Sequence, residues 1–106
     1  MNLTHTRITT MNIAKEILKQ LGGNKFIAMT GAKNLVAHAD GLSFRVGRNA
    51  KAVNYCKITL NTMDEYDCEF GAIRGTTYKV KSSCKAFCDT LQGAFESNTG
   101  LYTKLF

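Results

Sequence analysis

The stretch YCKITLNTMDEYDCEFGAIRGTTYKVK, residues 55–81, decides the fold. Three runs of alternating apolar and polar side chains, 55–60, 66–72 and 76–81, are separated by short polar or glycine-containing breaks. Side chains in a strand alternate between the two faces of a sheet, so each run is typical of a strand with one buried face. The stretch therefore predicts a meander of three antiparallel strands joined by two hairpins.

The first of these hairpins has one register that buries its apolar side chains together. With Leu60 opposite Tyr66, six apolar or aromatic side chains share one face of the sheet, and a slip of one residue would turn them to water. These side chains are Cys56, Ile58, Leu60, Tyr66, Cys68 and Phe70.

The second hairpin is expected to turn over three residues, Ile73-Arg74-Gly75. Gly75 then takes the position that favours a left-handed residue, a conformation that glycine adopts without a Cβ clash. In this register Tyr78 faces Phe70 and Val80 faces Cys68. The opposite face forms two charged rungs, in which Asp67 and Glu69 are salt-bridge partners rather than catalytic carboxylates: Lys57–Glu69–Lys79 and Thr59–Asp67–Lys81.

The chain before this stretch predicts one helix and three short strands. Residues 1–8 read as a loose lead-in, and Thr9 or Thr10 can cap a helix that Gly22-Gly23 ends. FIAMT (26–30) predicts a strand. Residues 35–46 predict a hairpin turning at Asp40-Gly41, with Ala39 opposite Leu42 and Leu35 opposite Val46, followed by a basic loop over 47–52.

The chain after this stretch predicts a second helix. Ser82 or Ser83 can cap it, Phe87, Leu91 and Phe95 recur every four residues, and Thr99-Gly100 is expected to end it. The apolar tail, residues 101–106, is expected to pack on the domain or on a second copy of the chain.

These elements predict an α+β fold, a two-layer sandwich in which an antiparallel meander of about six short strands packs against an N-terminal and a C-terminal helix. The 106 residues are the size of one domain, and no linker interrupts residues 1–106. No apolar run approaches the roughly 20 residues that span a bilayer. The N-terminus lacks the pattern of a signal peptide, so a cytoplasmic location is expected.

No catalytic motif stands out. The two histidines, His5 and His38, are not accompanied by a recognisable nucleophile and carboxylate. Cys56 and Cys68 belong to the predicted core, where a thiol behaves as a small apolar side chain. We therefore expect no enzymatic activity and no cofactor.

A metal site is also not expected. Cys84 and Cys88 stand four residues apart, which would place them on one face of the second helix. The paired C-x-x-C spacing of structural zinc sites is absent, and packing beside Phe87 and Leu91 explains both residues. A thiol enzyme that uses Cys84 or Cys88 is the remaining alternative.

The charge is uneven along the chain. Residues 1–61 hold nine Lys or Arg against two Asp or Glu, whereas residues 62–106 hold five against six. Such asymmetry indicates an anionic partner, often nucleic acid, although a basic surface also serves solubility. Phe26, Tyr55 and Tyr102 could stack on bases if exposed. The candidate residues for binding nucleic acid or a partner are Lys25, Lys33, Arg45, Arg48, Lys51 and Arg74.

Six segments between residues 12 and 105 resemble a family of short proteins from bacteriophage and prophage-like genomes. They are LGGNKFIAMTGAKN (21–34), LSFR (42–45), KITLN (57–61), YDCEF (66–70), IRGTTYK (73–79) and TGLYT (99–103). The resemblance implies no activity and no site residue. It implies the product of a phage or mobile element that works in the cytoplasm of a bacterial host.

Our leading hypothesis is a small non-enzymatic accessory protein of a phage or mobile element. It is expected to bind nucleic acid or a host nucleoprotein complex, and a counter-defence inhibitor of the anti-CRISPR type is the form we expect by analogy. The alternative is a phage structural or assembly protein that forms a homodimer through its apolar tail.

Overall fold

A computed structural model of the chain describes residues 13–49 and 51–101. The expected lead-in, the cap at Thr9 or Thr10 and the tail beyond Leu101 lie outside the described residues.

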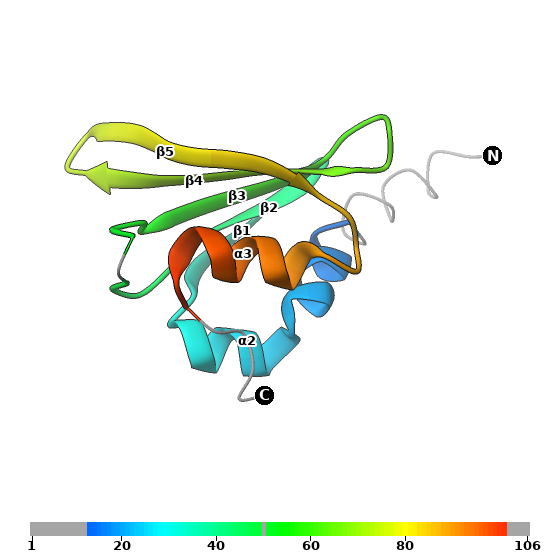
Figure 1. Cartoon of the computed structure of the whole chain (residues 1–106), viewed down its shortest axis with the longest axis horizontal. Coiled ribbons are helices and arrows are strands. Elements are labelled where there is room, and N and C mark those ends of the chain that lie inside the picture. The colour runs from blue at the N-terminus through cyan, green and yellow to red at the C-terminus, as the bar shows by residue number, and fades with distance from the viewer. Residues whose placement is uncertain (1–12, 50, 102–106) are drawn as a thin grey trace.

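A five-stranded antiparallel sheet forms one layer of the molecule (Figure 1). Its strands lie side by side in the order in which they occur along the chain, as in a meander. The predicted meander is therefore confirmed, with five strands instead of six. The strands are β1 (Lys33–His38), β2 (Gly41–Arg45), β3 (Tyr55–Leu60), β4 (Tyr66–Arg74) and β5 (Thr77–Ala86).

The predicted strand over residues 26–30 is wrong, because these residues belong to a helix, α2 (Gly23–Thr30). Gly22 has a φ of 129°, which lets the chain turn between the helical residues 13–21 and α2. Phe26 and Thr30 stand four residues apart and are both buried, so α2 has one inward face. A short apolar run alone does not distinguish a buried strand from a buried helix.

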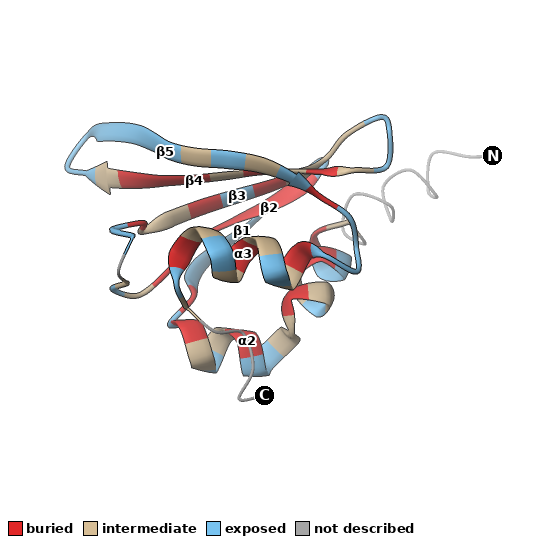
Figure 2. Ribbon diagram, viewed as in Figure 1, coloured by how far each residue is buried: buried red, intermediate tan, exposed pale blue. Residues whose placement is uncertain are grey.

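Helices cover one face of the sheet and leave the other face open (Figures 1 and 2). The helical layer contains residues 13–21, α2 and α3 (Leu91–Thr99). Phe26 from α2 and Phe95 from α3 pack edge to face, with ring centroids 5.1 Å apart, and Phe44 from β2 lies 5.4 Å from Phe26. This aromatic cluster joins the two layers, and the predicted two-layer α+β sandwich is confirmed.

The second helix begins later than predicted. Ser82 and Ser83 lie within β5, and Ser82 donates a hydrogen bond to Asn98 of α3 instead of capping a helix. Phe87 lies in the turn between β5 and α3 and is 52% exposed. The predicted end is confirmed: α3 stops at Thr99, and Gly100 is left-handed with a φ of 78°.

The two hairpins of the central stretch differ in how well their registers were predicted. Between β3 and β4, the register with Leu60 opposite Tyr66 is confirmed. Between β4 and β5 it is wrong, because the turn contains two residues and Ile73 pairs with Tyr78. Gly75 does adopt the expected left-handed φ, 62°.

A bulge in β5 shifts the pairing of β4 and β5 by one more residue away from the predicted register. The pairing shifts between Phe70, which lies opposite Ser82, and Gly71, which lies opposite Val80, so Lys81 is the extra residue in β5. As a result Lys79 and Lys81 are not members of the charged rungs. Their places opposite Glu69 and Asp67 are taken by Ser83 and Lys85.

The hairpin between β1 and β2 turns one residue earlier than predicted. His38 pairs with Gly41 and Ala37 with Leu42, so Ala39-Asp40 forms the turn. Gly41 is needed for another reason: a Cβ at this position would overlap the carbonyl oxygen of Ile58 on β3. Glycine therefore allows the close approach of β2 and β3 instead of forming the turn.

Candidate functional site

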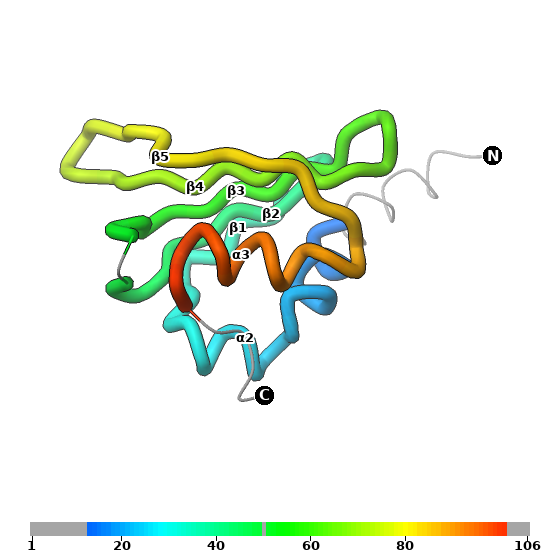
Figure 3. Tube along the Cα trace, viewed as in Figure 1, coloured from blue at the N-terminus to red at the C-terminus, as the bar shows by residue number. Residues whose placement is uncertain are grey.

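Many of the basic residues lie toward one end of the strands of the sheet. At one end lie the loop residues 46–49 and 51–54, the start of β1 and the tip of the β4–β5 hairpin, which extends past β3 (Figure 3). The acid-free segments 41–63 and 70–88 supply most of this end. We call it the basic end, and its residues are Lys33, Arg45, Arg48, Lys51, Arg74, Lys79 and Lys81.

Two of the predicted residues, Arg48 and Arg74, line one hollow at the basic end. The hollow has a volume of about 410 Å³, and both arginines are exposed. A guanidinium presents several N–H donors in a planar fork, which matches the oxygens of a phosphate or carboxylate. The hollow can therefore hold an anionic group between two cations that are 26 residues apart in the sequence.

Asn49 fixes the shape of the loop that carries Arg48. Its Oδ1 accepts hydrogen bonds from the backbone N–H groups of Lys51 and Val53, both at 3.1 Å. Its Nδ2 donates to the carbonyl oxygens of Gly47, at 2.9 Å, and Val53, at 2.5 Å. One side chain thus satisfies four backbone groups and ties Gly47, Lys51 and Val53 together.

Asn54 attaches this loop to the far hairpin. Its Oδ1 accepts from the backbone N–H of Ile73 at 2.8 Å, and its Nδ2 donates to the carbonyl oxygen of Ile73 at 3.0 Å. Its own backbone N–H donates to Gly71. Because Arg74 directly follows Ile73, these bonds place Arg74 beside the loop that carries Arg48.

The structure brings five of the six predicted binding residues to the basic end. Lys33 and Arg45 are cross-strand partners, and Lys51 lines a second hollow of about 270 Å³ together with Lys81. Lys25 is the exception. It lies near the start of α2, whereas the other end of that helix, at Thr30, accepts a hydrogen bond from Gly47 of the basic loop.

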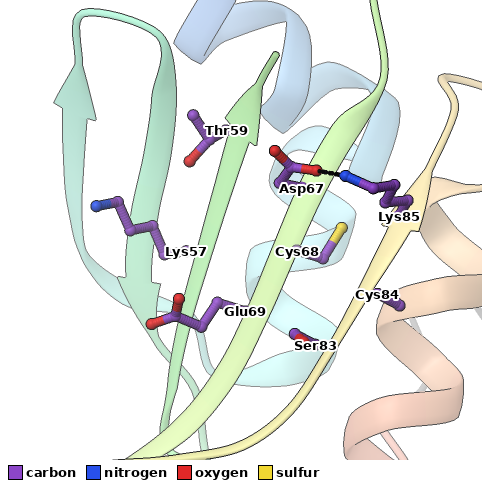
Figure 4. Close-up of a pocket in the computed structure, with 8 residues that line it drawn as sticks. All are labelled: Lys57, Thr59, Asp67, Cys68, Glu69, Ser83, Cys84 and Lys85. Atoms are coloured by element: carbon purple, nitrogen blue, oxygen red, sulfur yellow. Dashed lines mark hydrogen bonds and ion pairs between the residues drawn. The ribbon is translucent and has the colours of Figure 1, made fainter. Parts of the chain in front are cut away.

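The open face of the sheet carries a further hollow, of about 410 Å³, across β3, β4 and β5 (Figure 4). Lys57, Glu69 and Ser83 form one row across the strands. In the next row, Lys85 donates a hydrogen bond of 2.6 Å to Asp67. This bond, together with one from the amide of Asn61, lowers the pKa of Asp67, and the same pairing raises the pKa of Lys85.

Tyr78 is the residue that sequence reasoning misplaced most. It was expected on the core face opposite Phe70, but it lies on the open face, where its hydroxyl donates to Glu69 at 2.6 Å. Burial raises its pKa, and the hydrogen bond to Glu69 adds to the shift. Gly71 is the signal that could have located it, since a glycine inside a strand often marks a bulge.

The three aromatic residues that the sequence suggested for base stacking differ in position. Phe26 is fully buried in the core, so it does not meet the condition of exposure that base stacking requires. Tyr55 lies on the open face, and its ring meets that of Tyr78 edge to face, with centroids 5.4 Å apart. Tyr102 lies outside the described residues.

The cysteines do not share a helix face. Cys84 lies on β5 opposite Cys68, and Cys88 lies in the exposed turn after β5. Burial raises the pKa of Cys56, and it raises the pKa of Cys68 to about 12. Among residues 13–49 and 51–101, no three His, Cys, Asp or Glu side chains gather in a way that could hold a metal ion.

His38 and Ser43, which the predicted register placed opposite each other, are in contact although the observed register differs. The Nε2 of His38 and the Oγ of Ser43 are 2.7 Å apart, and Ser43 is only 4% exposed. In the part of the chain that the structure describes, His38 has no carboxylate partner. The pair thus lacks the group that orients the histidine of a catalytic triad.

Comparisons with known proteins give no further guide to the site. No protein-family model matches the sequence, and no curated protein and no solved structure matches it. None of the described helices combines the length and the apolar character that a membrane span requires.

Proposed function

We propose that this protein binds nucleic acid, or a nucleoprotein complex, through its basic end. The observation that carries the proposal is the hollow that Arg48 and Arg74 line together. Hydrogen bonds from the side chains of Asn49 and Asn54 hold the backbone around this hollow. The two exposed guanidinium groups at this hollow each offer several N–H donors to the oxygens of a phosphate.

The surroundings of the hollow support a polyanionic partner rather than a single small anion. Lys33, Arg45 and Lys51 lie at the same end of the molecule, and no acidic residue occurs in segments 41–63 or 70–88. A surface of this kind contacts several phosphates at once, and each contact releases condensed counterions.

We further propose that the protein acts by occupying a surface and not by catalysis. In the setting that the bacteriophage resemblance implies, the partner is a nucleic acid or a nucleoprotein complex in the host cytoplasm. A counter-defence inhibitor of the anti-CRISPR type is the specific form of this proposal.

Charge reversal at the hollow tests the proposal. We expect Arg48→Glu/Arg74→Glu to weaken binding to a fluorescein-labelled oligonucleotide by more than about ten-fold in fluorescence anisotropy. The matched control is Lys15→Glu/Lys19→Glu, which makes the same change in net charge at two exposed lysines in the helical residues 13–21. Equal loss in both variants would show that only net charge matters, and would overturn the assigned site.

A pull-down from bacterial lysate separates the two partner classes. The wild-type protein is compared with Arg48→Glu/Arg74→Glu, with and without nuclease. Material that nuclease releases is held through nucleic acid, whereas a defined protein that resists nuclease and is lost in the variant contacts the basic end directly, as a host nucleoprotein complex would through its protein component. Capture that the variant retains in full would contradict the proposal.

A further inference from the structure

The open face of the sheet carries an apolar and aromatic patch next to the basic end. Tyr55, Gly71 and Val80 form one row across β3, β4 and β5, and Ile73 pairs with Tyr78 in the row nearer the hairpin tip. Val80 is 48% exposed and Tyr78 39% exposed. No described helix covers this side of the sheet (Figures 1 and 2). The patch therefore exposes aromatic and aliphatic side chains to solvent.

The Tyr78 ring is fixed in place before any partner arrives. Gly71 leaves the space in which the ring lies, since a Cβ there would come within 2.5 Å of Tyr78 Cε1. The hydroxyl is anchored on Glu69, and Tyr55 supports the ring edge to face. A side chain that is already ordered loses little conformational entropy when a ligand packs on it.

Basic residues border the patch. Arg45 is the cross-strand partner of Tyr55, and Lys57 follows Tyr55 by two residues on the same face. Arg74 follows Ile73 near the hairpin tip, where its side chain alternates to the opposite face of β4. Glu69 is the nearest acid on this face. It lies opposite Lys57 and accepts the Tyr78 hydroxyl, so its charge is partly offset.

Aromatic rings beside cationic side chains match the chemistry of a single-stranded nucleic acid. Each base has a π-face that stacks on an aromatic ring, and each phosphate is attracted to a nearby cation. In a duplex the bases are stacked on one another and present only their edges, so they cannot reach a ring on a flat sheet.

We propose that this open face binds single-stranded nucleic acid, with bases packed on Tyr55 and Tyr78 and the sugar–phosphate chain running toward Arg45, Arg48 and Arg74. The inference rests on the proposed function, which it deepens by naming the class of nucleic acid. It also assigns the two tyrosines a binding role.

The test compares a single strand with a duplex on the full-length chain. Fluorescein-labelled oligo(dT) and oligo(U) of about twelve nucleotides, and a DNA duplex of about twelve base pairs, are titrated in fluorescence anisotropy. The variants are Tyr55→Leu/Tyr78→Leu, which keeps apolar bulk but removes both rings, and Tyr78→Phe, which keeps the ring and removes only the bond to Glu69. Circular dichroism melts check that each variant folds.

We expect tighter binding of the single strands, and about ten-fold weaker single-strand binding in the double leucine variant with little change for the duplex. Tyr78→Phe retains single-strand affinity. The chain has no tryptophan and four tyrosines, so stacking is also observed directly as quenching of tyrosine emission. If the double leucine variant does not fold, quenching of tyrosine emission in the wild type still decides the question, and its absence on saturation with oligo(dT) overturns the inference.

Two failures are distinguishable. Equal affinity of the wild type and the double leucine variant for single strands, with loss of binding in Arg48→Glu/Arg74→Glu, overturns the inference and leaves the proposed function intact. No binding of either nucleic acid by the wild type overturns both.

Discussion

The side-chain amide of Asn54 is bonded twice to the backbone of Ile73, which lies 19 residues further along the chain. The two hydrogen bonds close a ring between the basic loop and β4, as a strand pairing would. Asn54 and Ile73 line the same hollow as Arg48 and Arg74, so these bonds attach the loop to β4 at the proposed site.

Removing this amide is expected to affect both stability and binding. Asn54→Ala leaves the N–H and carbonyl of Ile73 without partners, and we expect a loss of about 1–3 kcal/mol in the free energy of unfolding. Urea denaturation measures the loss, and anisotropy measures the accompanying loss of affinity. Asn24→Ala, at an exposed position in α2, is the control. Identical stability of the two variants would contradict the assigned role.

Two glycine-to-alanine substitutions are expected to have opposite effects. At Gly71 a methyl group would approach the Tyr78 ring and, at 2.6 Å, the carbonyl oxygen of Lys79, so Gly71→Ala should destabilise the fold by about 1–3 kcal/mol. At Gly93, inside α3, it meets no atom within 4 Å, and Gly93→Ala should stabilise by about 0.5–1 kcal/mol. Thermal melts of both variants check the signs. A neutral Gly71→Ala would contradict the tight packing of Tyr78 on β4.

The thiols are expected to react in order of exposure. At a pH of about 8, iodoacetamide should modify the exposed Cys88 first, while Cys56 and Cys68 stay protected, because alkylation requires the thiolate. Burial raises the pKa of Cys56, and it raises that of Cys68 to about 12. Mass spectrometry of the native and the urea-unfolded protein follows each site. Rapid native labelling of Cys56 would contradict its place in the core.

The Asp67–Lys85 ion pair gives a pH dependence of known sign. Its hydrogen bond lowers the pKa of Asp67 below the ordinary 3.8, so the pair stabilises the fold above that pH, and the stabilisation is lost as pH falls through the folded-state pKa. We expect Lys85→Met to raise the pKa of Asp67 in an NMR titration of its carboxyl. Lys79→Met, an exposed lysine opposite Ala72, should leave it unchanged. An unchanged pKa in Lys85→Met would refute the coupling.

The predictable parts of the fold are those in which one constraint acts on a whole strand. Between β3 and β4, only one register buries Cys56, Ile58 and Phe70 together, and it is the register observed. Between β4 and β5 the extra residue at Lys81 changes the alternation halfway along the strand. Hydrophobic periodicity does not reveal such a bulge, so Tyr78 was assigned to the wrong face.

Local signals failed where tertiary contacts decide the outcome. FIAMT forms a helix in which Phe26 and Thr30 together face the core. Ser82 continues β5, where it pairs with Phe70 and its side chain bonds Asn98 of α3. For the basic end, the loop residues were identified from charge alone. The pairing of Arg48 with Arg74 depends on the hydrogen bonds of Asn54, which no sequence pattern specifies.

The measurement that tests the central claim most directly is the salt dependence of nucleic-acid binding. It compares the wild type with the variant Arg48→Gln/Arg74→Gln, which replaces the two positive charges by neutral side chains. If both arginines contact phosphates, the slope of log K against log salt concentration should fall in magnitude by about 1.4 for a single strand or about 1.8 for a duplex. A slope that is the same in both proteins would contradict the claim that this hollow binds the phosphate chain.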